Sequence, residues 1–119
     1  TLKDTQPGES SEAMRERVVR ARKVQEQRFA AHNTTAQKPI HCNAQMTPKM
    51  VRAYCQLDAQ GDKMLSYAMD KMGLSARAYD RILKVARTIA DLDNSSSIEM
   101  KHLSEAIGYR SLDREDWFS

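Results

Sequence analysis

Cysteine, glycine, proline and aromatic residues are all scarce in this chain of 119 residues, which holds two Cys, four Gly, three Pro and 6% aromatic residues. Two cysteines, Cys42 and Cys55, cannot form the disulfide framework that holds small secreted domains together. The low glycine and proline content excludes collagen-like and low-complexity chains. With 40% hydrophobic and 29% charged residues, the chain is expected to fold around one core as a single domain.

Long hydrophobic runs are missing too. No stretch approaches the roughly 18 apolar residues of a transmembrane span, and no apolar run follows a charged start as in a secretory signal. We therefore expect a cytoplasmic protein that has no membrane partner. The first ten residues are polar and include Pro7-Gly8, so residues 1–10 are predicted to be a linker from a preceding part of a longer protein.

Several motifs that carry chemistry are also absent. The chain has no G-x-x-x-x-G-K-[ST] loop and no G-x-G-x-x-G turn, so it cannot bind a nucleotide by those means alone. His32, His41, His102 and the two cysteines lack the paired spacing of a zinc site, and no metal is expected. No local feature indicates a lowered thiol pKa, which argues against a cysteine nucleophile.

Helical periodicity is what the sequence does contain, and no alternating pattern of the strand type occurs. Helices are predicted over about 11–31, 48–56, 58–73 and 76–93, with a last short helix around residues 100–107 that starts from a capping box of Ser96 and Glu99. The segment 33–45 reads as a loop. The predicted fold class is an all-α bundle of about five helices, two of them short, over residues 11–110, followed by a flexible tail at 111–119.

The first predicted helix carries the net charge of +3. Residues 12–28 hold six basic residues against three glutamates, and the apolar stripe of this helix is thin and interrupted by Gln25 and Arg28. The interleaved glutamates and the lack of nearby aromatic residues favour a solvated or domain-docking face over contact with nucleic acid. Both interpretations stay open, and the candidate contact residues are Arg15, Arg20, Arg22 and Lys23.

The turn between the third and fourth predicted helices is the most informative segment. Gly73 ends one helix, Ser75 caps the next, and Arg77 stands at its second position. Anions are favoured there by the free N–H groups and the positive end of the helix dipole, and a guanidinium can hold a phosphate through two hydrogen bonds. By position alone, however, such an arginine is usually a surface residue that pairs with Asp80 or with solvent.

The rest of this fourth helix has two further charged features. Arg81 and Lys84 continue from Arg77 as a narrow basic stripe on the side opposite the apolar one. Arg87 and Asp91 stand four residues apart, a spacing typical of a structural ion pair on a helix.

The segment from Gly73 to Leu92 (GLSARAYDRILKVARTIADL) resembles the C-terminal domain of the magnesium-chelatase-like AAA+ ATPases, the YifB and ComM group. Further matching segments at 8–11, 27–29, 43–46 and 109–114 extend the resemblance over about residues 8–114. In that family this part of the chain is the helical lid that follows the ATPase core. The resemblance therefore implies that the core, in the same chain, is the lid's first partner.

The resemblance also implies a function for the parent protein. It would bind and hydrolyse ATP with Mg²⁺, assemble as a ring that is expected to be a hexamer, and act on DNA as a branch-migration helicase in natural transformation. Arg77 would be the sensor-2 arginine that contacts the terminal phosphate, with Arg81 as a second candidate for this contact. The fragment alone would not be an enzyme. The alternative prediction is a stand-alone helical module that binds nucleic acid or another protein through its basic first helix.

Overall fold

The computed structural model describes the backbone of residues 10–35 and 38–116, and the side chains of the same ranges up to Tyr109. These residues contain no strand. Five α-helices, α1 (Ser11–Asn33), α2 (Pro48–Tyr54), α3 (Ala59–Met72), α4 (Ala76–Leu92) and α5 (Met100–Asp116), are joined by loops that include a 3₁₀ turn, η2 (Asn43–Gln45). The predicted all-α bundle of about five helices is therefore confirmed. Residues 1–9 of the predicted linker lie outside the described residues.

Short polar side chains start four of these helices, and one of them is Ser75, the cap predicted for α4. Each accepts a hydrogen bond from a backbone N–H in the first turn, which satisfies one of the donors left free at a helix start. The four caps are Ser10, Thr47, Asp58 and Ser75. Pro48 follows Thr47 at the first position of α2, where its missing N–H costs nothing.

The start of α5 differs from the prediction. The capping box of Ser96 and Glu99 is not formed, because the Glu99 N–H donates to Nδ1 of His102 at 2.9 Å instead. The imidazole is buried and reaches Asp93 with its other nitrogen, Nε2, at 2.8 Å. His102, three residues after Glu99, thus takes the role predicted for Ser96. The helix is also longer than the short one predicted, since its backbone continues to Asp116.

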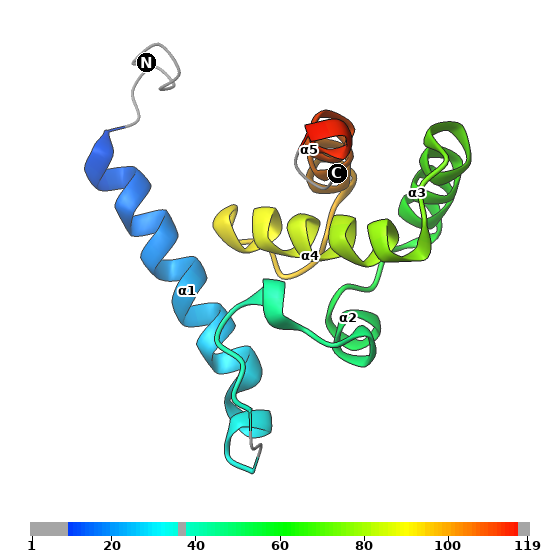
Figure 1. The fold of residues 1–119 in the computed structure, drawn as a ribbon. Helices are drawn as coiled ribbons and strands as arrows, with labels where there is room; N and C mark the ends of the chain where they lie inside the picture. The colour runs from blue at the N-terminus through cyan, green and yellow to red at the C-terminus, as the bar shows by residue number, and fades with distance from the viewer. Residues whose placement is uncertain (1–9, 36–37, 117–119) are drawn as a thin grey trace.

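Helix α4 is the centre of the arrangement (Figure 1). It packs against α1, α2, η2 and α5, while α3 packs against α5. The predicted apolar stripe of α4 supplies Ile82, Leu83, Ala86 and Ala90 to the core, where they meet Phe29 of α1 and other buried residues. Burial of this continuous stripe explains why α4 lies in the middle, since a fully buried Leu or Ile side chain contributes roughly 1.5–3 kcal/mol.

The residues of helix α1 that are buried against the body all lie from Ala21 onward, and the start of the helix extends away from the body (Figure 1). Its buried residues are Ala21, Gln25 and Phe29, and every residue from 14 to 20 is exposed. This limited burial agrees with the thin, interrupted apolar stripe of the first predicted helix. None of the helices in the described part of the chain is long and apolar enough to cross a membrane.

Candidate functional site

The α3–α4 turn positions Arg77 through local backbone geometry. Gly73 adopts a left-handed conformation with φ of 62°, which a residue without Cβ reaches at little cost. The Leu74 N–H then donates to the Met69 carbonyl at 3.0 Å, which closes the end of α3. Ser75 Oγ accepts from the Ala78 N–H at 3.3 Å and starts α4. The turn and cap together fix the direction in which α4 begins and hence the location of Arg77.

The Arg77 side chain is exposed and makes no hydrogen bond or ion pair with the described residues. The pair with Asp80 that its position suggests is not formed. The first turn of α4 also contains no acidic residue, so nothing there offsets the positive end of the helix dipole. Arg77 is thus a cation at a helix start whose guanidinium donors are available to a ligand.

The basic stripe predicted along α4 is divided by its surroundings. Arg81 is half-buried and interacts with other groups of the chain. Lys84 is also half-buried, and its Nζ donates to the carbonyl of Ala44 beside η2 at 3.3 Å. Of these three residues, Arg77 alone is both exposed and without a partner among the described residues. It is therefore the one residue of the predicted stripe whose charge is fully available to a ligand.

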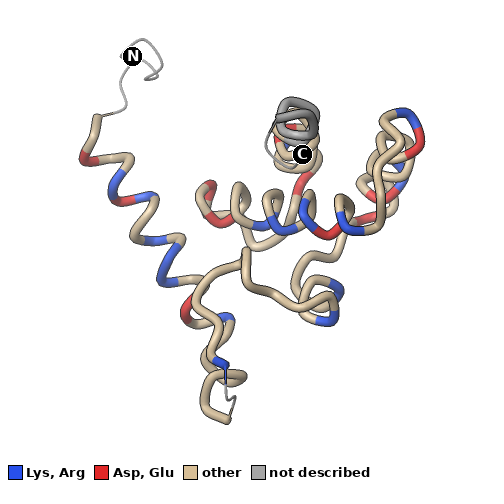
Figure 2. The backbone as a smooth tube through the Cα atoms, in the orientation of Figure 1, with Lys and Arg blue, Asp and Glu red and all other residues tan. Residues whose placement is uncertain are grey.

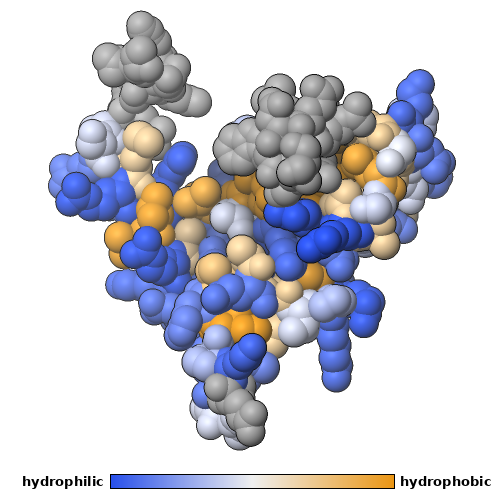
Figure 3. Space-filling model, viewed as in Figure 1, coloured by the Kyte–Doolittle hydropathy of each residue, from blue (hydrophilic) through white to orange (hydrophobic). Residues whose placement is uncertain are grey.

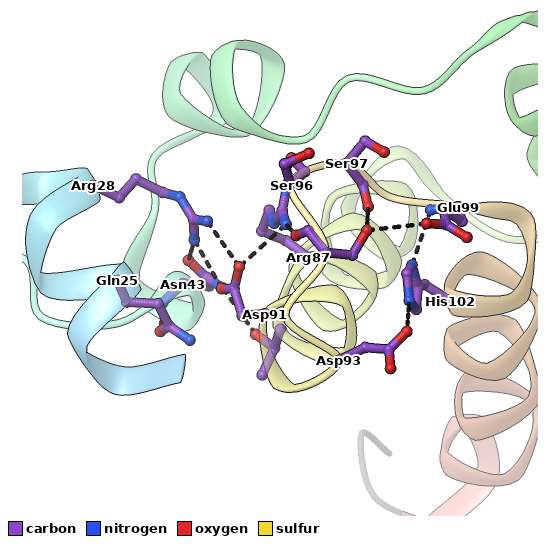
Figure 4. Close-up of polar contacts among 12 residues, drawn as sticks. Gln25, Arg28, Asn43, Arg87, Asp91, Asp93, Ser96, Ser97, Glu99 and His102 are labelled. Carbon is purple, nitrogen blue, oxygen red and sulfur yellow. Dashed lines mark hydrogen bonds and ion pairs between the residues drawn. The ribbon is translucent and has the colours of Figure 1, made fainter. Parts of the chain in front are cut away.

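The opposite end of α4 is fixed by a buried polar network (Figure 4). Arg28 of α1 forms two parallel hydrogen bonds with the Asp91 carboxylate, at 2.8 and 2.9 Å. Asn43 donates to the same carboxylate at 2.9 Å and accepts from Arg28 at 2.8 Å. Arg87 completes the network with a 3.2 Å contact to Asp91, which confirms the predicted structural pair. Three segments distant in sequence are therefore joined at one carboxylate.

The Asp91 carboxylate stays ionised in this network. Burial raises its pKa, but the hydrogen bonds from Arg28 and Asn43, together with the charges of Arg28 and Arg87, outweigh that effect and hold the pKa below its ordinary value. Burial lowers the pKa of Arg87, and the nearby Asp91 carboxylate opposes this change. The ionised Asp91 carboxylate therefore links α1 to α4 through Arg28 and also binds Arg87 of its own helix.

Sequence reasoning did not find three members of this network: Gln25, Arg28 and Asn43. In the sequence, Gln25 and Arg28 interrupt an apolar stripe, Arg28 is one of six basic residues in 12–28, and Asn43 lies in a segment without periodicity. Gln25 is in fact buried and accepts from the Asn43 N–H at 3.0 Å. A usable signal exists, since polar residues on the buried face of a helix need partners, and a nearby asparagine in a loop can supply them.

The basic residues predicted on α1 lie apart from Arg77. Arg15, Arg20, Arg22 and Lys23 are all exposed, and Figure 2 shows positive and negative residues interleaved along this helix. Helix α1 joins α4 at Asp91, which is 14 residues, or about 21 Å of helix, from Arg77. The structure therefore contains two separate basic features rather than one continuous site.

The two cysteines lie in different environments. Cys42 is exposed and Cys55 is buried, and the two are not disulfide bonded. Burial raises the pKa of the Cys55 thiol to about 11, an effect that the nearby Arg87 and Arg28 charges only partly offset. No three His, Cys, Asp or Glu side chains gather into a possible metal site in the part of the chain that the structure describes.

Comparison with known proteins identifies the chain's relatives. The model of the family described as magnesium chelatase, subunit ChlI C-terminal, matches residues 8–110. The chain belongs to this family. It is 41% identical over 108 residues to the uncharacterized protein YifB of Escherichia coli and 40% identical over 107 residues to the competence protein ComM of Haemophilus influenzae. An uncharacterized Mycobacterium tuberculosis protein is 30% identical over 103 residues.

These matches cover most of this chain but little of the relatives. The alignments to YifB and ComM span 91% and 90% of the chain. They span 19% of each relative, so the chain corresponds to about a fifth of their length. Family membership confirms the resemblance to the magnesium-chelatase-like group, and it agrees with the small all-α bundle seen in the structure.

Proposed function

We propose that this chain is the C-terminal lid of a longer, cytoplasmic AAA+ ATPase and that Arg77 contacts the terminal phosphate of ATP bound by the preceding core. The observation that carries the proposal is the state of Arg77, which is exposed and unpartnered among the described residues at the start of α4. A planar guanidinium binds phosphate through two parallel hydrogen bonds, and the helix dipole adds a favourable field. Family membership supports the proposal.

The chain itself would contribute only part of the nucleotide site. It contains no phosphate-binding loop, so the preceding core would hold ATP and Mg²⁺. Arg77 would then contact the phosphate while ATP is present and lose that contact after hydrolysis and phosphate release. Such a differential contact can shift the equilibrium between two lid positions by its own free-energy difference, about 1–3 kcal/mol for typical couplings.

The contacts that hold α4 within the domain suit this role. Asp91 ties the far end of α4 to α1 and η2, and Ile82 and Ala86 bury its middle in the core. A pull on Arg77 would therefore move the whole domain rather than bend one helix. The position of the lid would then depend on whether the terminal phosphate is present.

We further propose that the parent assembles as a ring, expected to be a hexamer, and acts on DNA during branch migration. One relative of this chain is named a competence protein, and this supports a place in natural transformation. In a ring, the lid of each subunit would help complete a nucleotide site between neighbours. The change in lid position would then be passed around the assembly.

The test is Arg77→Ala in the full-length protein. We expect ATP turnover to fall about 10²-fold or more, as for other arginines that stabilise transferring phosphate. Arg77→Lys should recover only part of the rate, because an ammonium keeps the charge but loses the two-pronged geometry. The matched control is Arg52→Ala, which removes an exposed arginine from α2. Unchanged turnover in a normally assembled Arg77→Ala protein would contradict the proposal.

A further inference from the structure

The apolar stripe that docks α1 on the body continues beyond the body. Ala21 and Gln25 are buried on one face of α1, and Met14 and Val18 precede them on that same face at helical spacings of four and three residues. Met14 and Val18 are nevertheless 44% and 45% exposed. The first half of α1 therefore presents an uncovered extension of a docking face.

A cleft of about 430 Å³ adjoins this extension, between α1 and the facing parts of α4 and α5. One wall of the cleft is apolar, formed by Ile89 and Leu92 of α4 and by Tyr109, which is 49% exposed. The rest of its lining is polar and consists of Arg17, Asp93, Lys101, His102 and Glu105. Figure 3 shows hydrophobic surface along the first half of α1 and towards the end of α4. Met14, Val18, Ile89, Leu92 and Tyr109 are called the α1 groove below.

The charges around the α1 groove indicate the chemistry of its occupant. At 100° per residue, Arg15 and Arg22 lie on one side of the Met14–Val18 stripe and Arg17 lies on the other. The glutamates of this helix lie further from the stripe. Arg15 and Arg22 make no ion pair with the described residues. On the Arg17 side, the lining of the cleft holds charges of both signs, with Asp93 and Glu105 beside Arg17 and Lys101. The Arg15 and Arg22 side carries positive charge alone, so an apolar ridge with carboxylates along that border would complement the groove.

Two other kinds of occupant fit less well. A nucleic acid backbone needs cations gathered on one face, whereas an apolar stripe separates Arg17 from Arg15 and Arg22. A second copy that paired its own stripe with this one would bring the flanking arginines of both copies together. Like charges at close range oppose such pairing.

The lengths of the relatives identify a better candidate. The matched segment is 19% of YifB and of ComM, and the family is described as a C-terminal one. Most of such a protein would precede this domain and would connect to it at the start of α1, which is where the stripe is uncovered. We propose, resting on the function proposed above, that the α1 groove is the seat on which the preceding part of the full-length protein docks through an acid-bordered apolar ridge.

This contact would give the domain a second attachment to the core. Arg77 would touch the nucleotide at one end of α4, while the α1 groove would touch the core near the other end. The first half of α1 would then connect the core to the helical domain. Because Arg28 and Asp91 join α1 to α4, a movement of α1 would also move α4.

Hydrogen exchange tests the proposal. Amides of residues 14–20 should exchange at least about tenfold more slowly in the full-length protein than in the 119-residue chain, because docking adds to the free energy of local opening. Val18→Asp in the full-length protein should abolish this difference. The matched control is Tyr67→Asp, which places the same charge at a 65% exposed aromatic residue of α3 and should leave the protection intact. Equal exchange in the two wild-type proteins would overturn the proposal.

Two measurements separate the other outcomes. Sedimentation of the 119-residue chain should give a monomer; a dimer that Val18→Asp dissociates would instead assign the groove to a second copy and overturn the proposal. Turnover of Arg77→Ala reports on the nucleotide contact alone. If that turnover is normal while residues 14–20 remain protected, the phosphate contact fails and the docking interface is supported.

Discussion

The two ends of α4 carry arginines in opposite situations. Arg87, near the carboxyl end, is 5% exposed and is bonded to Asp91 and to the carbonyls of Ser95 and Ser96. Arg77, near the amino end, is exposed and has no partner among the described residues. Burial obliges a guanidinium to find partners inside the fold, while exposure leaves it available to a ligand. The buried end thus serves stability, and we assign the exposed end to function.

The largest expected effect on stability is at the buried end. Asp91→Ala leaves two guanidinium groups without their shared carboxylate, and we expect the free energy of unfolding to fall by about 3–5 kcal/mol. Urea unfolding of the 119-residue chain measures this loss of free energy. Asp80→Ala, on the same helix but outside the network, should change the free energy of unfolding by less than about 0.5 kcal/mol. A similar small loss for both variants would contradict the structural role of Asp91.

The pH dependence sharpens the same contrast. The folded-state pKa of Asp91 lies below its ordinary value of 3.8, so its contribution to stability is complete above that value and is lost as the pH falls through the folded-state pKa. The stability difference between the wild type and Asp91→Asn should therefore be constant near neutral pH and shrink below about pH 4. The pKa of Asp93 is also lowered, but Asp93 is present in both proteins, so its contribution cancels in the stability difference. Denaturant unfolding at several pH values measures the difference, and a gap that persists at pH 2–3 would count against an ionised Asp91.

The smallest expected effect is at the exposed end. Ser75→Ala removes the side-chain acceptor for the Ala78 N–H and should cost about 1 kcal/mol. Ser66→Ala, at an exposed position inside α3, is the control and should be neutral or slightly stabilising. Thermal unfolding compares the two. If Ser75→Ala is neutral as well, the cap does not hold the start of α4 and another contact positions Arg77.

The local features of the fold could be predicted from the sequence because each depends on neighbouring residues. Ser75 caps its own helix, Gly73 ends the one before it, and the α4 stripe follows from helical spacing. The location of Arg77 comes from the same short segment. The Ser96 and Glu99 box fails for an instructive reason: His102 competes for the same N–H, and spacing alone does not show which acceptor wins.

The buried polar network around Asp91 could not be predicted in the same way. Arg28 and Asp91 are 63 residues apart, and no periodicity links a residue on one helix to a carboxylate on another. Asn43 lies in a loop whose sequence contains no pattern, and only its burial beside Gln25 reveals its role. The angle at which α1 leaves the body depends on these contacts, and so does the α1 groove.

The sequence by itself determined the helices, their caps and the family of this protein, because helix formation depends on hydrogen bonds and side-chain spacing within a few residues. The tertiary structure alone decided which charges are buried and which are available. Arg28 and Arg87 became structural because packing removed water from them and placed Asp91 within reach. Arg77 kept its donors available because its side chain stays exposed and meets no partner among the described residues.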